Sequence, residues 1–221
     1  MNRAVDLFIF DLAGTVVVDD DQVLKAFVAT ARFYDLPVDE GAIRTRMGWH
    51  KQRVFESVLT ELGRSTAAAA EMAARFADEY ANVVAESPLR PTHGAPEMLL
   101  ALASAGVKIA FNTGFARTTA DLVLRAVGFD KWPSVASDEV ETGRPAPDLI
   151  HRAMALSDVS DPQRVGVAGD TPADLAAGCA AGLRLVVGVG CGTHTLEQLA
   201  AHEHTHLLPD LSTLPAIVLP S

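Results

Sequence analysis

Two aspartates follow apolar runs at the points where buried strands would end. Asp11 follows Leu7–Phe10, and Asp170 comes two residues after Val165–Ala168. Because ligands of open α/β sheets bind outside the carboxyl ends of the strands, we expect both carboxylates in one site. Carboxylate oxygens are the ligands that Mg²⁺ prefers, and Asp174, one helical turn after Asp170, is placed to orient a metal-bound water. The sequence therefore predicts a magnesium site, although an aspartate such as Asp11 also opens turns without a catalytic role.

Three further residues offer donors to an anion. Thr113 and Gly114 follow the apolar run Ile109–Asn112 and supply a hydroxyl and an unhindered backbone N–H at a strand-to-helix turn. Arg144 precedes Pro-Ala-Pro-Asp and supplies a planar fork of donors. Taken alone, Arg144 is more typical of a surface arginine before a proline turn. Together with the two aspartates, these residues indicate a site for a phosphoryl or phosphonyl group.

In their order along the chain, these stretches resemble the four motifs of the haloacid dehalogenase superfamily. Two departures narrow the resemblance: Ala13 stands where the superfamily usually has a second aspartate, and Arg144 where it usually has lysine. Both departures, together with the sequence Met47-Gly48-Trp49-His50-Lys51, are similar to the phosphonatase (phosphonoacetaldehyde hydrolase) branch. The resemblance implies that Asp11 is the nucleophile and that the backbone carbonyl of Ala13 is a further metal ligand.

Ala13 bears on the leaving group. A methyl group cannot protonate a leaving oxygen, so either the enzyme is crippled or the leaving group needs no such acid. A carbon leaving group fits the second case when a protonated imine takes up the electrons, and Lys51 can form that imine with a carbonyl. We expect the pKa of Lys51 to be lowered by the helix N-terminus and by like charges close in sequence; these are Arg44, Arg46, His50 and Arg53.

The resemblance thus implies a Mg²⁺-dependent hydrolase that cleaves the C–P bond of a 2-oxoalkylphosphonate such as phosphonoacetaldehyde, through a Schiff base on Lys51 and an aspartyl-phosphate on Asp11. Val54 stands where the branch often has histidine, so the carbonyl substrate is left open. A small-molecule phosphomonoesterase or phosphomutase of the same superfamily is the alternative enzyme. A binding protein with a disabled phosphatase site is the alternative outside enzymology.

Periodicity divides the chain into two parts. Residues 1–16 and 91–221 predict an α/β core with a Rossmann-like parallel sheet, and residues 17–90 predict an inserted α-helical cap. Helices are expected in the cap at residues 22–34, 39–46, 51–62 and 65–86. In the core, helices are expected at residues 96–104, 117–127, 147–156 and 171–181, and strands at 7–10, 108–111, 165–168, 183–189 and 206–208.

Composition limits the partners. The formal net charge of −10 argues against nucleic acid and anionic membranes, and no apolar span is long enough to cross a bilayer, so we expect a cytoplasmic protein that acts on a small molecule. His202, His204 and His206 alternate as metal ligands on a strand would, but a polar edge strand is the more common explanation. Phe76 and Tyr80 lie on the longest predicted helix and belong either to the cap core or to a homodimer interface.

Overall fold

The computed structural model describes residues 3–219 and contains one sheet whose neighbouring strands are all parallel. The strand order is β3-β2-β1-β4-β5-β6. The bounds are β1 Leu7–Phe10, β2 Lys108–Asn112, β3 Ser134–Val135, β4 Val165–Gly169, β5 Leu185–Val189 and β6 His206–Leu208. The prediction of a Rossmann-like parallel α/β core is confirmed.

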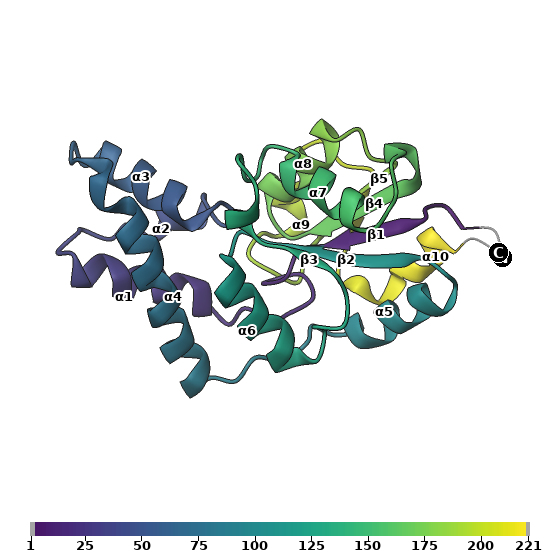
Figure 1. The fold of residues 1–221 in the computed structure, drawn as a ribbon, viewed down its shortest axis with the longest axis horizontal. Helices are drawn as coiled ribbons and strands as arrows, with labels where there is room; N and C mark the ends of the chain where they lie inside the picture. The colour runs from purple at the N-terminus through teal and green to yellow at the C-terminus, as the bar shows by residue number, and fades with distance from the viewer. Residues whose placement is uncertain (1–2, 220–221) are drawn as a thin grey trace.

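The central strand β1 is buried on both faces, which explains why its sequence is a continuous apolar run rather than an alternating one. Phe8 and Phe10 pack on one face, and Leu7 and Ile9 pack on the other. Helices α5, α6 and α10 cover the first face, and α7, α8 and α9 cover the second (Figure 1). These helices are α5 Ala95–Ser104, α6 Arg117–Val127, α7 Asp148–Leu156, α8 Pro172–Ala180, α9 Leu196–Ala200 and α10 Leu214–Val218.

The chain between β1 and α5 forms four further α-helices, named the cap helices here, which lie beyond one end of the sheet (Figure 1). They are α1 Gln22–Phe33, α2 Glu40–Arg44, α3 Lys51–Glu61 and α4 Ala69–Glu86. Short 3₁₀ turns occupy Thr66–Ala68, Ser137–Glu139, Pro162–Arg164 and Leu211–Thr213. The boundaries of the cap at residues 17 and 90 stay a prediction.

An aromatic cluster joins the cap helices to the core. The Phe27 ring centroid lies 4.6 Å from that of Phe76, and the Phe115 centroid in the core lies 4.9 Å from that of Tyr80. Phe76 and Tyr80 are each only 1% exposed in the single chain. Of the two roles expected for these residues, packing within the chain therefore accounts for their burial. Aromatic rings packed in this way stabilise the contact between the cap helices and the core, both by burying apolar surface and by their mutual orientation.

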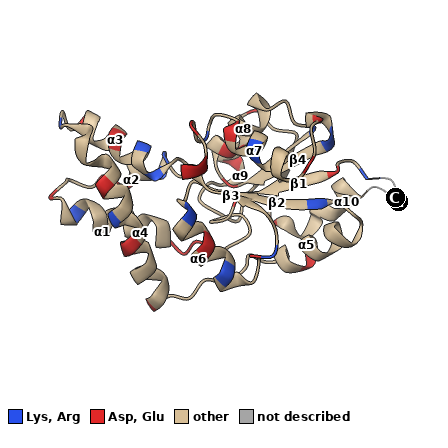
Figure 2. Cartoon of the chain, in the orientation of Figure 1, with Lys and Arg blue, Asp and Glu red and all other residues tan. Residues whose placement is uncertain are grey.

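Most of the expected elements are present, with ends shifted by a few residues. The structure adds the two-residue strand β3 and the five-residue helices α9 and α10, which the periodicity did not predict. No helix within residues 3–219 is long and apolar enough to span a membrane. Figure 2 shows acidic and basic positions interspersed over the cap helices and the core, in keeping with a net charge that is negative without being confined to one part.

Candidate active site

The carboxyl ends of the three adjacent strands β1, β2 and β4 bring the predicted site residues together. Asp11 follows β1, Thr113 follows β2 and Asp170 follows β4, and all three line one pocket. Thr113 is buried, and its hydroxyl accepts a hydrogen bond from the Phe115 N–H at 3.2 Å. Three side chains that are far apart in sequence meet because parallel strands end at the same edge of the sheet.

Arg144 is buried at the centre of this site, with 2% of its surface exposed. Its Nη2 atom lies 2.8 Å from Asp11 Oδ1, and its Nη1 atom forms an ion pair with Asp174 Oδ1. The preceding turn is held by the Asp148 carboxylate, which accepts a hydrogen bond from the Thr142 N–H at 3.1 Å. Arg144 is therefore not a surface arginine, and its guanidinium balances the charge of two buried carboxylates.

Asp170 is fully buried and held from two sides. Its Oδ2 atom accepts a hydrogen bond from the Thr193 N–H at 2.6 Å, and its Oδ1 atom accepts one from the Thr15 hydroxyl at 3.3 Å. A Cβ atom at Gly14 would come within 3.0 Å of this carboxylate, so any residue other than glycine at this position would clash with Asp170. Burial, with the Asp11 charge as a second cause, raises the pKa of Asp170 to about 7.

Asp11, Asp170 and Asp174 together fit a divalent cation. Each is buried and offers one carboxylate oxygen, and these atoms lie within 4.8 Å of one another. Burial, followed by the charge of Asp11, disfavours the ionised form of Asp170, and a bound cation would favour that form. Asp174 Oδ2 is held by the Thr171 hydroxyl at 2.5 Å. Three carboxylate oxygens this close together are the kind of ligand set that Mg²⁺ prefers.

Lys51 reaches this site from the cap as the first residue of α3. The side chain is buried, and its Nζ atom lies 5.4 Å from the Phe27 ring centroid, 5.5 Å from that of Phe76 and 4.9 Å from that of Phe115. The three ring faces attract the ammonium, but its removal from water opposes that attraction. Lys51 also lines the pocket that contains Asp11, so the two residues expected to form covalent bonds share one space.

The pKa of Lys51 is lowered to about 8, in the expected direction but for a different reason. Burial is the largest cause, and the charge of Arg144 is the second, while Asp11 and Asp19 act in the opposite sense. The like charges expected from neighbours in sequence do not cause the shift, since Arg44 pairs with Asp21 and Arg46 pairs with Glu61. The three-dimensional position of Lys51 therefore matters more than its neighbours along the chain.

Among the residues of this pocket that were not predicted are Asp19 and Phe115. Asp19 lines it, with its Oδ1 atom accepting a hydrogen bond from the Val23 N–H at 3.1 Å, and burial raises its pKa. Phe115 packs against Lys51 from the core side. The only sequence signal for Asp19 was its place in an acidic run, and Phe115 could have been noticed as the residue after the Thr-Gly pair.

The pocket is closed by a loop of the cap that touches the core directly. A Cβ atom at Gly114 would lie 2.6 Å from the Trp49 carbonyl oxygen and 2.7 Å from that of Gly48, and Gly48 itself has a φ of +83°. The enclosed volume is about 20 Å³, which is room for about one water molecule. This volume is smaller than a phosphonate group, so the space must widen before a substrate can bind.

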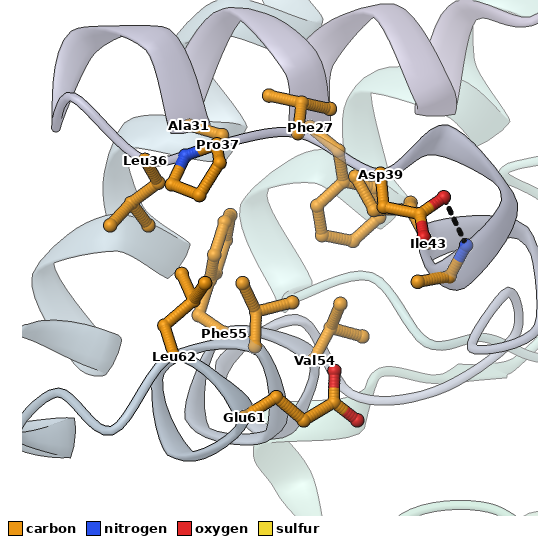
Figure 3. A pocket seen from close by; sticks show the side chains of 13 residues that line it. Phe27, Ala31, Leu36, Pro37, Asp39, Ile43, Val54, Phe55, Glu61 and Leu62 are labelled. Atoms are coloured by element: carbon orange, nitrogen blue, oxygen red, sulfur yellow. Dashed lines mark hydrogen bonds between the residues drawn. The ribbon is translucent and has the colours of Figure 1, made fainter.

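Other candidates lie elsewhere. Among the described residues, His202, His204 and His206 do not form a metal-like group, and only His206 belongs to a strand. A pocket of about 80 Å³ lies inside the cap between α1, α2 and α3 and is lined almost entirely by apolar side chains such as Phe27, Ile43 and Phe55 (Figure 3). It contains none of the residues predicted to do chemistry.

Comparison with known proteins agrees with this geometry. Residues 5–182 match the model of the haloacid dehalogenase-like hydrolase family. A protein named probable phosphatase IndB from Dickeya dadantii (strain 3937) is 30% identical over 203 residues, which cover 89% of this chain and 86% of that protein. A phosphonoacetaldehyde hydrolase from Latilactobacillus sakei subsp. sakei (strain 23K) is 27% identical over 203 residues, covering 84% of this chain and 75% of that protein.

Solved structures give the same fold. A hydrolase from Pseudomonas syringae superimposes with a TM-score of 0.86 at 25% identity, covering 96% of this chain and 97% of that one. A phosphonoacetaldehyde hydrolase-like protein from Oleispira antarctica superimposes with a TM-score of 0.82 at 20% identity, covering 98% and 93% of the two chains. The family match extends over most of the chain and over every site residue from Asp11 to Asp174. The chain belongs to the haloacid dehalogenase-like hydrolases.

Proposed function

We propose that this hydrolase cleaves the C–P bond of a 2-oxoalkylphosphonate. The observation that carries the proposal is that Lys51, a buried amine with a pKa lowered to about 8, lines the same pocket as Asp11. A lysine that is partly neutral near pH 8 is a nucleophile toward carbonyls. A phosphate ester would require no amine at this place, but it would require an acid, and Ala13 supplies none.

Asp11, Asp170 and the backbone carbonyl of Ala13 would hold Mg²⁺, and Asp174 would orient its water. When bound, the ion neutralises charge on the phosphonyl oxygens and on the nucleophile. The Arg144 Nη2 atom lies 2.8 Å from Asp11 Oδ1, so its guanidinium is close enough to donate hydrogen bonds to the oxygens of the transferred group when that group binds beside Asp11. The Thr113 hydroxyl and the Gly114 N–H would bind the remaining oxygens.

The first covalent step belongs to Lys51. The Nζ lone pair attacks the carbonyl carbon, and loss of water from the resulting carbinolamine leaves a protonated imine. The protonated imine then serves as the electron sink. When an Asp11 oxygen bonds to phosphorus, the C–P bond breaks and its electron pair forms the C=C bond of a neutral enamine on Lys51.

Two hydrolyses complete the cycle. Protonation of the enamine at carbon restores the protonated imine, and water releases the aldehyde or ketone and frees the Lys51 amine. A second water attacks the aspartyl-phosphate on Asp11 and releases phosphate. The phosphorus ends as phosphate and the carbon keeps its oxidation level in the carbonyl product, so the reaction needs no oxidant or reductant.

Reductive trapping tests this proposal. Incubation with phosphonoacetaldehyde or 2-oxopropylphosphonate and borohydride should inactivate the enzyme and leave a secondary amine on the peptide that contains Lys51. Lys51→Arg should lose both phosphate release and the mass increment, because arginine keeps the charge but forms no imine. Lys25→Arg is the matched control, since Lys25 lies on α1 with its ammonium exposed. Absence of any mark with every carbonyl phosphonate would rule the proposal out.

The alternative enzyme is a phosphomonoesterase or phosphomutase, which the relative named as a probable phosphatase favours. Ala13→Asp separates the two. If carbon is the leaving group, the added carboxylate gives no gain in phosphonate turnover and harms it by placing another charge beside Asp11 and Asp170. A large gain toward phosphate esters would support the phosphomonoesterase. A disabled binding protein would release phosphate from neither class of substrate.

A further inference from the structure

A second space adjoins Lys51. It is a cleft of about 290 Å³ between α3, α4 and the first turn of α6, and Lys51 lines both this cleft and the pocket of Asp11. The carbonyl carbon joined to Lys51 would therefore have the phosphonate on one side and the cleft on the other. A hydrogen atom, which is the second substituent in phosphonoacetaldehyde, would leave the cleft to water.

The floor of the cleft is made of small side chains. Four alanines of α4 line it, including Ala73 and Ala77, and these leave the volume that larger residues would fill. The apolar pocket inside the cap is not an alternative location for a substituent, because Lys51 does not line it. The Phe27 ring lines that pocket, and its centroid lies 5.4 Å from the Lys51 Nζ atom. The cleft is thus the space that a substituent on the carbonyl carbon can reach.

The walls of the cleft carry uncharged hydrogen-bonding groups. Thr118 and Thr119 lie in the first turn of α6; Thr118 is exposed to water, whereas Thr119 is 5% exposed, and within residues 3–219 its hydroxyl has no hydrogen-bond partner. Burial, with the charge of Lys51 as the second cause, lowers the pKa of His50, which keeps its ring neutral at pH 7. Asp138 lies at the exposed rim, and its carboxylate accepts a hydrogen bond from the Arg117 N–H at 2.9 Å.

We propose that the native substrates are 2-oxoalkylphosphonates whose carbonyl carbon carries a further uncharged chain with hydroxyl or amide groups, and that this cleft binds the chain. This inference rests on the C–P cleavage proposed above. An apolar chain would cover the buried Thr119 hydroxyl without giving it a partner, and a charged chain would meet a like charge, either the Asp138 carboxylate at the rim or the protonated imine on Lys51. Discrimination comes from the hydroxyl of Thr119, and the allowed size comes from the alanines of α4.

The test compares three substrates on the intact enzyme: phosphonoacetaldehyde, 2-oxopropylphosphonate and 4-hydroxy-2-oxobutylphosphonate. The hydroxylated ketone should have the highest kcat/KM, by about tenfold over 2-oxopropylphosphonate, as expected for one satisfied buried hydrogen bond. Thr119→Val keeps the shape of the buried side chain and should remove most of that advantage while leaving phosphonoacetaldehyde unaffected. Equal kcat/KM for the three substrates would overturn the inference.

Filling the cleft gives an independent readout. Ala77→Leu should lower kcat/KM for the hydroxylated ketone by about tenfold or more and spare phosphonoacetaldehyde, because only the longer substrate needs the space. Ala85→Leu, on an exposed position of the same helix outside the cleft, is the matched control. An equal loss for all substrates would assign the effect to damage of α4 and count against the subsite. If Ala77→Leu does not fold, the Thr119→Val comparison decides.

The outcomes separate this inference from the proposed reaction. A reduced mark on Lys51 with phosphonoacetaldehyde, but no preference for the hydroxylated ketone, would keep C–P cleavage and reject the subsite. If no carbonyl phosphonate marks Lys51, the proposed reaction fails and the inference fails with it. A mark with the hydroxylated ketone that Thr119→Val weakens would support both.

Discussion

The Nζ atom of Lys51, on a cap helix, lies 4.9 Å from the ring centroid of Phe115, which comes from the core. The environment that desolvates this lysine is therefore complete only when the two parts of the chain are in contact. Movement of the cap loop away from Gly114 would expose the amine to water and return its pKa toward 10.5. The amine is at its most reactive in the closed arrangement.

We predict that imine formation depends on pH with a midpoint near 8. Below that pH Lys51 is an ammonium ion, so the rate of trapping by cyanoborohydride should rise about tenfold per pH unit and level off above the midpoint. Asp19 favours the ammonium form, so Asp19→Asn should move the midpoint to lower pH. Asp20→Asn is the control, because Asp20 is exposed and pairs with Arg90. A midpoint near 10.5 in the wild type would contradict the burial of the amine.

A divalent cation should bind at a single site that depends on Asp170. Calorimetry with Mg²⁺ or Mn²⁺ should detect it in the wild type, and Asp170→Asn should abolish it, while Asp158→Asn, an exposed position, should not. Because the pKa of Asp170 is raised to about 7 without the ion, binding should release a proton and weaken as the pH falls below about 7. Unchanged binding in Asp170→Asn would place the metal elsewhere.

Removing Arg144 should destabilise the metal-free protein. Arg144→Met leaves the carboxylates of Asp11 and Asp174 buried without a partner, and the free energy of unfolding in urea should fall by about 3–5 kcal/mol. Mg²⁺ should restore part of that loss, because a cation that binds the folded carboxylates stabilises the folded state. Arg164→Met removes a half-buried surface pair with Asp6 and should change the free energy far less. Equal losses in both variants would contradict the role given to Arg144.

Gly114→Ala should slow catalysis without unfolding the core. The new methyl group meets the Trp49 and Gly48 carbonyl oxygens at 2.6 and 2.7 Å, so the loop cannot close as it does in the wild type. Gly114 does not have a positive φ, so alanine fits the backbone of the core itself. We expect kcat/KM to fall by about tenfold or more with little change in Tm, since a small displacement of the reacting groups is costly. A parallel loss of Tm would assign the defect to the core instead.

The sequence predicted the core of the site because strand ends and motif order are local properties. Asp11, Thr113 and Asp170 each follow an apolar run, and a parallel sheet brings such positions together whatever lies between them. Arg144 was ambiguous, since a surface position and a buried ion pair have the same sequence pattern. Only the fold shows that its guanidinium is buried against two carboxylates.

What the sequence did not predict depends on contacts between the cap and the core. Asp19 and Phe115 became site residues only through packing that involves α3 and α4. The strand β3 has two residues and no periodicity to detect, and helix α9 has only its Thr195 and Gln198 capping pair as a local signal. The cause of the lowered pKa of Lys51 was likewise a matter of burial, which no spacing along the chain reports.

The placement of Lys51 on the cap and Asp11 on the core has a consequence for the direction of the reaction. Under the proposed mechanism, the two halves of the substrate remain bonded to different parts of the chain after the C–P bond breaks. Any opening of the cap loop then carries the enamine away from the phosphorylated aspartate. The two fragments are then too far apart to recombine. C–P cleavage is therefore made irreversible by this separation as well as by the later hydrolyses.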